Sequence, residues 1–259
     1  PPAGTPTMKI VACVKRVPAT DTRVKIDADG TSIDTSQVEW IINPYDEFAV
    51  EAALQIKEAA GDGEVVVVML GPPEATKELR TCLAMGADSA VLLKDSESST
   101  RDATTTAAAL AGVIGELSAD LVLCGKVAVD HDQGQVGSLV AAHLGWPCVT
   151  EIRALEVAGD KATCERGGGS GNTEKYDVTL PAVLTCNKGL NEPRYASLKG
   201  IMAAKKKPID ERDADVSAPR LSVAKMDLPA ERSGGRIVGE GAEAVPELMR
   251  LLREEAKVL

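Results

Sequence analysis

Aromatic residues are nearly absent from this chain, which has one Phe, two Trp and three Tyr among 259 residues. The core must therefore be aliphatic, and few rings are available to stack on a base or a flavin. Histidine is equally scarce: His131 and His143 are the only two, which argues against a histidine-based metal site. We expect any ligand of this chain to be bound mainly through backbone groups, and we expect no metal.

The chain also lacks a surplus of basic residues. Its formal net charge is −10, which argues against nucleic acid as a partner. None of the six cysteines forms a CxxC pair, and most lie within apolar runs, as is typical of small buried residues in a reducing compartment. No apolar run approaches a membrane span and no signal peptide is visible. We expect a cytoplasmic protein if the source is bacterial, or a mitochondrial matrix protein if it is eukaryotic.

The first part of the chain alternates short apolar runs with helical patterns. Apolar content is 44%, which is enough for one large domain. Such alternation, with short connections, predicts a doubly wound, mostly parallel α/β sheet of the adenine-nucleotide-binding type. The expected strands are residues 9–14, 64–70, 90–93, 121–124 and 147–152, and the expected helices are residues 47–60, 74–85, 101–117 and 135–144.

The pattern changes after Thr150. Residues 151–157, 162–166, 176–180 and 182–186 predict an antiparallel extension, with the glycine run at 167–171 as a hairpin tip. Residues 210–240 show no period, and a final helix at 244–257 carries an apolar stripe that we expect to cover a partner chain. The predicted divisions are a lead-in at 1–7, a nucleotide-binding domain at 8–187, a recognition loop and basic segment at 188–209, and a C-terminal arm and helix at 210–259.

Residues 120–146 form the stretch around which the chain is organised. An apolar run leads into a loop with Gly125 and Gly134, and a helical pattern follows. Loop amides and a helix N-terminus can hold a phosphate, and a loop carboxylate such as Asp130 can bind ribose hydroxyls. The loop is neither GxGxxG nor a P-loop, so an ordinary turn between a strand and a helix remains an equal alternative at this point.

Several segments together resemble a known family. The segments KIVACVKRVP, NPYDEFAVEAAL, CLAMGADSAVLL, CGKVAVDHDQGQVG and LPAVLTCNKGLNEPRYASLKGIMAAKKKPI occur here in the order seen in the small (beta) subunit of electron transfer flavoprotein. The resemblance covers residues 8–209. It implies a heterodimer with a large (alpha) subunit that holds most of the site for the redox FAD, and it implies no catalytic residues in the small subunit.

The resemblance also implies two sites. One would bind a structural AMP through Cys13, Asn43, Pro44, Tyr45, Asp46, Leu70, Gly125, Lys126, Val127, Ala128, Val129, Asp130, His131, Asp132, Gln133, Gly134, Gln135 and Val136. The other would dock flavoprotein dehydrogenases, such as acyl-CoA dehydrogenases, and a quinone reductase. It would use Tyr195, Leu198, Ile201, Met202, Lys205, Lys206 and Lys207. From the residues alone, Leu198 reads more readily as a satellite core residue, and the three lysines as a solvated helix end.

Two alternatives stay open. Electron-bifurcating relatives carry a loop resembling DGDTAQVGP and bind a second FAD in place of AMP; Asp130, Asp132 and residues 135–137 partly match that loop, whereas His131 and Ser138 depart from it. The recognition segment resembles the non-bifurcating branch, so we expect AMP. A stand-alone adenine-nucleotide enzyme or sensor would need a phosphate-activating group, for which Asp130, His131 and Asp132 are the only candidates.

Overall fold

The computed structural model of this chain describes residues 8–230 and 234–259. The predicted lead-in at residues 1–7 lies outside the described residues. The chain divides into two compact units, Pro1–Lys225 and Met226–Leu259.

The first unit is built on one large sheet to which nine strands of the described residues contribute. Their order is β11-β5-β4-β1-β6-β10-β7-β8-β9, and all neighbours from β11 to β7 are parallel. The predicted fold class, a mostly parallel α/β sheet with an antiparallel extension, is therefore confirmed. The strands are β1 (Lys9–Cys13), β4 (Glu64–Gly71), β5 (Ser89–Lys94), β6 (Leu121–Gly125), β7 (Cys148–Ala158), β8 (Lys161–Gly167), β9 (Thr173–Thr179), β10 (Ala182–Cys186) and β11 (Ile209–Asp213).

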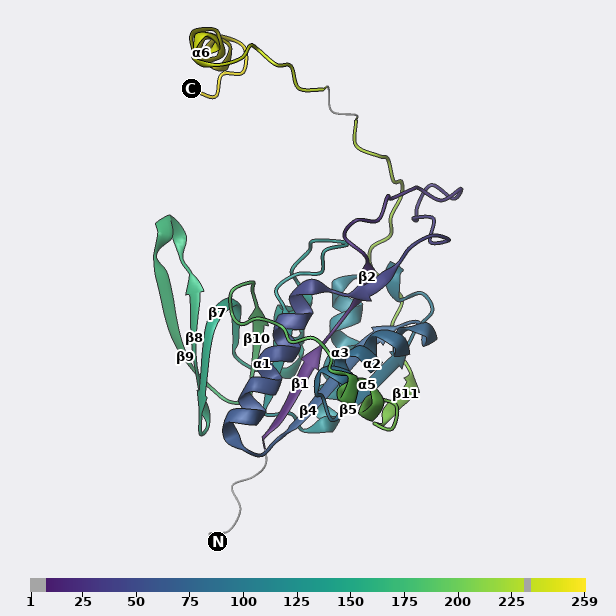
Figure 1. Ribbon diagram of the computed structural model, residues 1–259. Coiled ribbons are helices and arrows are strands. Elements are labelled where there is room, and N and C mark those ends of the chain that lie inside the picture. Colours follow the sequence, from purple (N-terminus) through teal and green to yellow (C-terminus); the bar gives the residue numbers. More distant parts are fainter. Residues whose placement is uncertain (1–7, 231–233) are drawn as a thin grey trace. The chain divides into compact units, whose positions relative to one another are not determined.

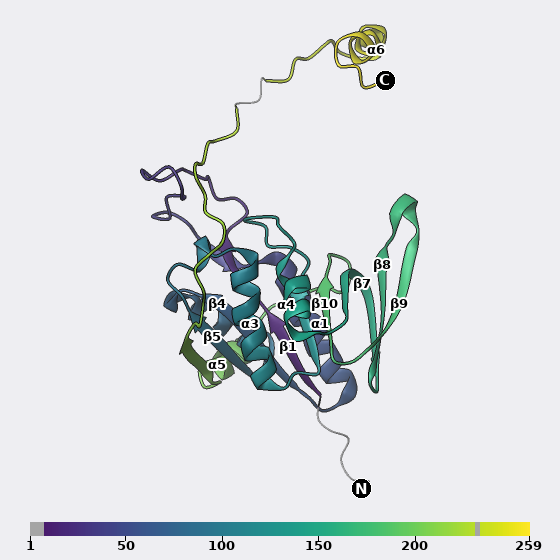
Figure 2. The ribbon, with the colours of Figure 1, turned by 180° about the vertical axis from the view of Figure 1, so that it is seen from behind.

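Helices cover both faces of the sheet, which explains why its central strands read as unbroken apolar runs. Figure 1 shows α1, α2 and α5 on one face, and Figure 2 shows α3 and α4 on the other. Aliphatic residues fill the core on each side, as the scarcity of aromatic residues requires. The helices are α1 (Pro44–Ala60), α2 (Thr76–Met85), α3 (Ala103–Leu117), α4 (Val136–Leu144), α5 (Leu198–Ala204) and, in the second unit, α6 (Val245–Glu254).

Short elements complete the first unit. Strands β2 (Arg16–Pro18) and β3 (Trp40–Ile42) form a small antiparallel sheet, and the chain between them turns at Gly30, whose φ is 69°. An isolated antiparallel bridge from Ile26 to Ile33 closes that turn. The 3-10 helices are η1 (Pro73–Ala75), η2 (Ser98–Thr100), η3 (Gly169–Gly171) and, in the second unit, η4 (Ala242–Ala244).

Three sequence predictions about the later strands were wrong. Strand β10, expected in the antiparallel extension, lies between β6 and β7 and is parallel to both. All five of its residues are buried. Its sequence, AVLTC, does not alternate between apolar and charged residues because helices or loops cover both faces of a strand at the centre of the sheet. Strand β7 is one continuous strand across the expected break at Thr150, and only its distal half pairs antiparallel with β8.

Strand β11 was the third error, since no strand was expected after residue 209. It pairs with β5 at the edge of the sheet, where charged residues such as Glu211 face solvent. Charged residues on an edge strand oppose pairing with a further strand. They also interrupt the apolar pattern by which a strand is recognised in the sequence, which is why β11 was not predicted.

The order of the strands places a switch point at β1. The chain proceeds from β1 to β4 and β5 in one direction, and returns to the other side of β1 with β6. Ligands of open parallel sheets bind at such a point, beyond the carboxyl ends of the strands. The loop that follows β6 lies at that edge (Figure 1).

The second unit contains α6, whose apolar residues Val245 and Leu248 are exposed, whereas Leu251 and Leu252 are half-buried. The predicted stripe is therefore present on the helix. Its expected packing on a partner chain remains a prediction. Among the described residues, no helix combines the length and apolar character that crossing a bilayer requires.

Candidate functional site

A pocket opens at the switch point, between the carboxyl ends of β1, β4 and β6 and the N-terminus of α4. It is lined by Cys13 and Cys124, which are paired neighbours on β1 and β6. Its walls combine the apolar side chains of Leu70 and Leu110 with polar residues from the loops. The sequence-predicted residues that line it are Cys13, Asp46, Leu70, Gly125, Lys126, Val127, Ala128, His131, Gln133, Gly134, Gln135 and Val136.

Sequence reasoning missed part of the pocket lining and included residues that lie outside it. Of the predicted set, Asn43, Pro44, Tyr45, Val129, Asp130 and Asp132 are not in the lining. The missed lining residues are Val14, Lys15, Ser98, Arg101, Ala103, Thr106, Leu110, Cys124 and Gly137. The signal for several of them was available, because Ser98 and Arg101 follow β5 and such loops gather at the same edge of the sheet.

Asn43 supports the loop from behind. It is fully buried, its Nδ2 donates to the carbonyl of Val127 (2.9 Å), and its Oδ1 accepts from the backbone N–H of Val129 (3.2 Å). Asn43 is the N-cap residue of α1, yet its side chain makes no capping bond to the helix. The start of α1 therefore holds the loop after β6 across 84 residues of sequence.

Asp46 is a second support and also lines the pocket. Its carboxylate accepts the backbone N–H of Lys15 (2.7 Å) and of Gly125 (3.0 Å), so it joins the ends of β1 and β6. Burial raises the pKa of Asp46 to about 7, against opposing hydrogen bonds from Asn43, Lys15 and Gly125. The carboxyl group is therefore half-protonated near neutral pH.

This pKa predicts a pH-dependent stability. The folded state binds the Asp46 proton more tightly than the unfolded chain, so the associated stability is present below pH 4 and lost as the pH rises through 7. We expect Asp46→Asn to remove this slope. Measured by urea unfolding, the free energy of unfolding of the native chain should fall relative to that of Asp46→Asn by up to about 3 kcal/mol between pH 4.5 and 8. Parallel pH profiles would contradict the assignment.

Two ion contacts organise the loop between β6 and α4. Asp130 pairs with Lys15 at 2.6 Å, and Lys126 lies 5.1 Å from the centre of the Tyr45 ring. Beside them, burial lowers the pKa of His131, and the charge of Lys15 adds to that effect. The ion pair of Asp130 with Lys15 ties the loop to the residues that follow β1.

The N-terminus of α4 supplies the polar end of the pocket. The helix packs closely on the sheet at Gly137, where a Cβ would lie 2.6 Å from Cγ2 of Thr185. The side chain of the N-cap residue, Gln135, makes no hydrogen bond to the helix. The first backbone N–H groups of α4 are therefore not capped by the side chain of Gln135. This end can therefore receive an anion through its N–H groups, while Leu70 and Leu110 can receive a flat apolar group. Arg101 also lines the pocket, but its guanidinium group is paired with Asp95 and Glu97.

A second candidate surface lies on α5 and the residues just before it. Tyr195, Leu198, Ile201 and Met202, here called the docking face, are 99%, 79%, 45% and 59% exposed. Leu198, Ile201 and Met202 have the i, i+3, i+4 spacing that puts them on one side of α5. The structure thus places Leu198 in an exposed apolar group rather than in a satellite core.

The three lysines of the predicted docking set differ in their surroundings. Lys205 and Lys206 are exposed, but Lys207 is half-buried and its Nζ donates to the carbonyls of Leu83 (3.0 Å) and Gly86 (3.3 Å) at the end of α2. Burial lowers its pKa. Lys207 therefore caps α2, and only the other two lysines are placed to attract an acidic partner.

No group of three or more His, Cys, Asp or Glu side chains within residues 8–230 and 234–259 is arranged to hold a metal ion. All the free cysteines of this part except Cys148 are buried, and burial raises the pKa of Cys164 to about 11.

Comparison with known proteins agrees with this architecture. A family model described as "Electron transfer flavoprotein domain" matches residues 30–217. The electron transfer flavoprotein subunit beta of Bacillus subtilis is 43% identical over 248 residues, covering 92% of this chain and 96% of that protein. The caffeyl-CoA reductase-Etf complex subunit CarD of Acetobacterium woodii is 44% identical, covering 96% and 99%.

A mitochondrial relative, the electron transfer flavoprotein subunit beta of Oryza sativa subsp. indica, is 37% identical and covers 97% of this chain and 100% of that protein. These matches extend over nearly the whole length of this chain and of each relative. This chain belongs to the electron transfer flavoprotein family, among its beta subunits.

Proposed function

We propose that this chain is the small subunit of a heterodimeric electron transfer flavoprotein, and that it binds one structural AMP and docks flavoprotein dehydrogenases. The observation that carries the proposal is the pocket at the β1/β6 switch point, built from the loop after β6 and the start of α4. The redox FAD would be held mainly by the large subunit. This chain would supply the partner interface, the nucleotide site and the docking face, with no catalytic residue.

The chemistry of the pocket fits AMP. An adenine ring needs apolar walls and backbone groups, which Leu70, Leu110 and the loop offer. A phosphate needs N–H donors and positive charge, which the N–H groups and the partial positive charge at the start of α4 offer. The low aromatic content is no obstacle, because neither requirement calls for a stacked ring.

The decisive experiment co-expresses the chain with its large subunit, denatures the purified complex and quantifies the released nucleotides by chromatography. We expect one FAD and one AMP per heterodimer. Two FAD and no AMP would make the protein a bifurcating subunit. A chain that is stable alone and releases neither nucleotide would support the stand-alone adenine-nucleotide protein and contradict the proposal.

A loop variant gives a second test. Asp130→Ala should reduce AMP retention to less than about half, because Lys15 loses its 2.6 Å partner and the loop loses its tie to β1. The measurement is AMP per heterodimer after gel filtration, with FAD content as the internal reference. Removal of a partly exposed ion pair elsewhere, in Lys9→Met, serves as the control and should leave AMP in place. Full AMP occupancy in Asp130→Ala would show that the loop tie is dispensable.

The docking face is the proposed contact for dehydrogenases. Its exposed apolar residues lie on a helix that is fixed to the rest of the protein. They offer a small binding surface of the kind that transient electron-transfer contacts use. Lys205 and Lys206, at the end of α5, would attract acidic surfaces toward it. A quinone reductase or another acceptor would receive the electrons.

A further inference from the structure

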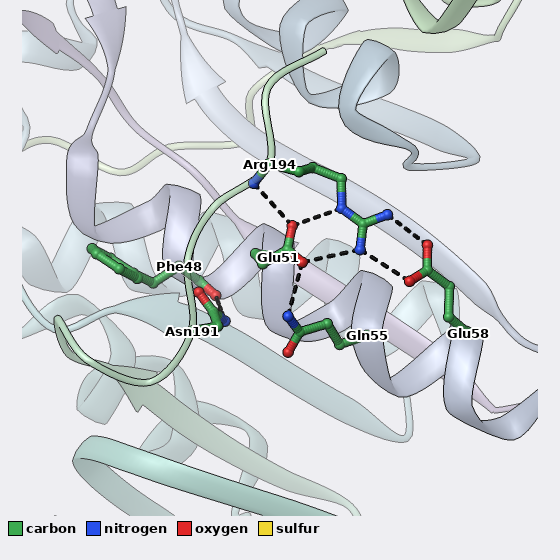
Figure 3. A network of polar contacts seen from close by, with 6 residues as sticks. All are labelled: Phe48, Glu51, Gln55, Glu58, Asn191 and Arg194. Carbon is green, nitrogen blue, oxygen red and sulfur yellow. Dashed lines mark hydrogen bonds and ion pairs between the residues drawn. The ribbon is translucent and has the colours of Figure 1, made fainter. Parts of the chain in front are cut away.

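The segment that leads to the docking face has no regular secondary structure, but side-chain contacts fix it on α1. Residues 188–197 run across the surface of this helix (Figure 3). Asn191 begins the attachment, since its Nδ2 donates to the carbonyl of Phe48 at 3.0 Å. Arg194 then makes a far denser set of contacts, three residues before the N-cap residue of α5, Ser197.

Arg194 is bound by two carboxylates of α1. Its Nε and Nη2 donate to the two oxygens of Glu51 (2.8 and 3.0 Å), and its Nη1 and Nη2 donate to the two oxygens of Glu58 (2.6 and 3.0 Å). The backbone N–H of Arg194 also donates to Glu51 at 3.2 Å. Paired bonds to two carboxylates restrict both the position and the plane of the guanidinium group.

The two partners of this contact differ in burial. The side chain of Glu51 is only 4% exposed, whereas that of Arg194 is 33% exposed. Gln55 donates to Glu51 at 2.9 Å, and Glu51, Gln55 and Glu58 lie at i, i+4 and i+7 on the same side of α1 (Figure 3). A buried carboxylate is costly without its counter-ion, so Glu51 holds Arg194 against the helix.

The far end of the docking face has its own anchor. Nη1 of Arg80 donates to the carbonyls of Ala204 and Lys207, each at 2.6 Å, and Lys207 caps α2. Gly200 touches α2 so closely that a Cβ would lie 2.3 Å from the carbonyl oxygen of Ala84. The docking face is therefore held at its C-terminal end by α2 and at its N-terminal end by the Arg194 contacts.

We propose that Arg194 is a positioning residue for electron transfer, which, bound between Glu51 and Glu58, holds the docking face in the conformation that a dehydrogenase recognises. This inference rests on the proposed docking function. The physical reason is preorganisation: a segment that is already ordered loses less conformational freedom on binding. Arg194 itself need not touch the dehydrogenase.

The test uses the heterodimer with an acyl-CoA dehydrogenase as electron donor. Arg194→Met should raise the KM for the heterodimer about tenfold, leave kcat within about twofold, and leave FAD and nucleotide content unchanged. Arg194→Lys should give an intermediate KM, because an ammonium group cannot bind two carboxylates in paired fashion. Arg212→Met is the matched control, since Arg212 is also bound by two carboxylates, Asp210 and Glu116, but on β11.

Hydrogen exchange of the heterodimer separates positioning from general destabilisation. In Arg194→Met, exchange should accelerate in residues 195–204 and stay unchanged in the central strands. An unchanged KM in Arg194→Met, with a raised KM in Leu198→Ala, would overturn this inference and leave the docking function intact. Unchanged KM values in both variants would overturn the docking function as well. Loss of FAD or nucleotide, or a fall in kcat without a rise in KM, would show that Arg194 is structural rather than positioning.

Discussion

Gly125→Ala should empty the proposed nucleotide site and destabilise the fold. A Cβ at this position would lie 2.2 Å from Oδ1 of Asp46 and 2.8 Å from the carbonyl carbon of Tyr45. Both atoms belong to the first turn of α1, and a shift of this turn would break the hydrogen bonds that the backbone N–H groups of Lys15 and Gly125 donate to Asp46. The free energy of unfolding should fall by about 3 kcal/mol, as for other overpacked sites.

The measurement is the nucleotide content of the purified heterodimer together with its urea unfolding midpoint. We expect AMP to fall below about a tenth of the native value, because the loop and the start of α1 would separate at the pocket edge. Gly112→Ala is the matched control: Gly112 lies within α3, an added Cβ there would have nothing within 4 Å, and alanine should be neutral or stabilising. Full AMP content in Gly125→Ala would refute the close-packing argument.

The predictable part of the pocket was its local part. An apolar run, a loop with glycines and a helical pattern are contiguous in sequence, so β6, the loop and α4 could be recognised from residues 120–146. The supports behind the loop were not recognisable in the same way. Asn43 binds Val127 and Val129 across more than 80 residues, and the NPYD segment reads equally well as the start of a helix.

In the docking segment, too, the contacts with distant parts of the chain were not predictable. From the residues alone Leu198 read as a satellite core residue, and only the resemblance pointed to the exposed position that the structure gives it. Lys207 was grouped with Lys205 and Lys206 because a run of lysines looks uniform in sequence, whereas its role depends on the carbonyls at the end of α2. The bond between Arg194 and Glu51 was equally hidden, since 143 residues separate them. Both contacts join parts of the chain that are distant in sequence, and a single sequence does not state which distant parts meet.

Leu198→Ala should reduce kcat/KM for electron transfer from an acyl-CoA dehydrogenase by about 30-fold. Leu198 is 79% exposed, so it contributes little to the core, and its large apolar surface gains most from being covered by a partner. Truncation of a central anchor residue commonly costs about 2 kcal/mol of binding free energy, which corresponds to that factor. The measurement is steady-state reduction of the heterodimer over a range of its concentrations.

Two comparisons make this result specific to docking. Leu198→Met keeps the apolar volume and should retain most of the native kcat/KM, because such exchanges are tolerated at apolar contacts. Reduction by dithionite needs no docking and should proceed at the native rate in every variant. Since an exposed side chain contributes little to folding, the unfolding midpoint of Leu198→Ala should stay close to that of the native protein. Native kinetics with the dehydrogenase would mean that electrons enter the heterodimer through a different surface, and the exposed leucine would then need another partner to explain it.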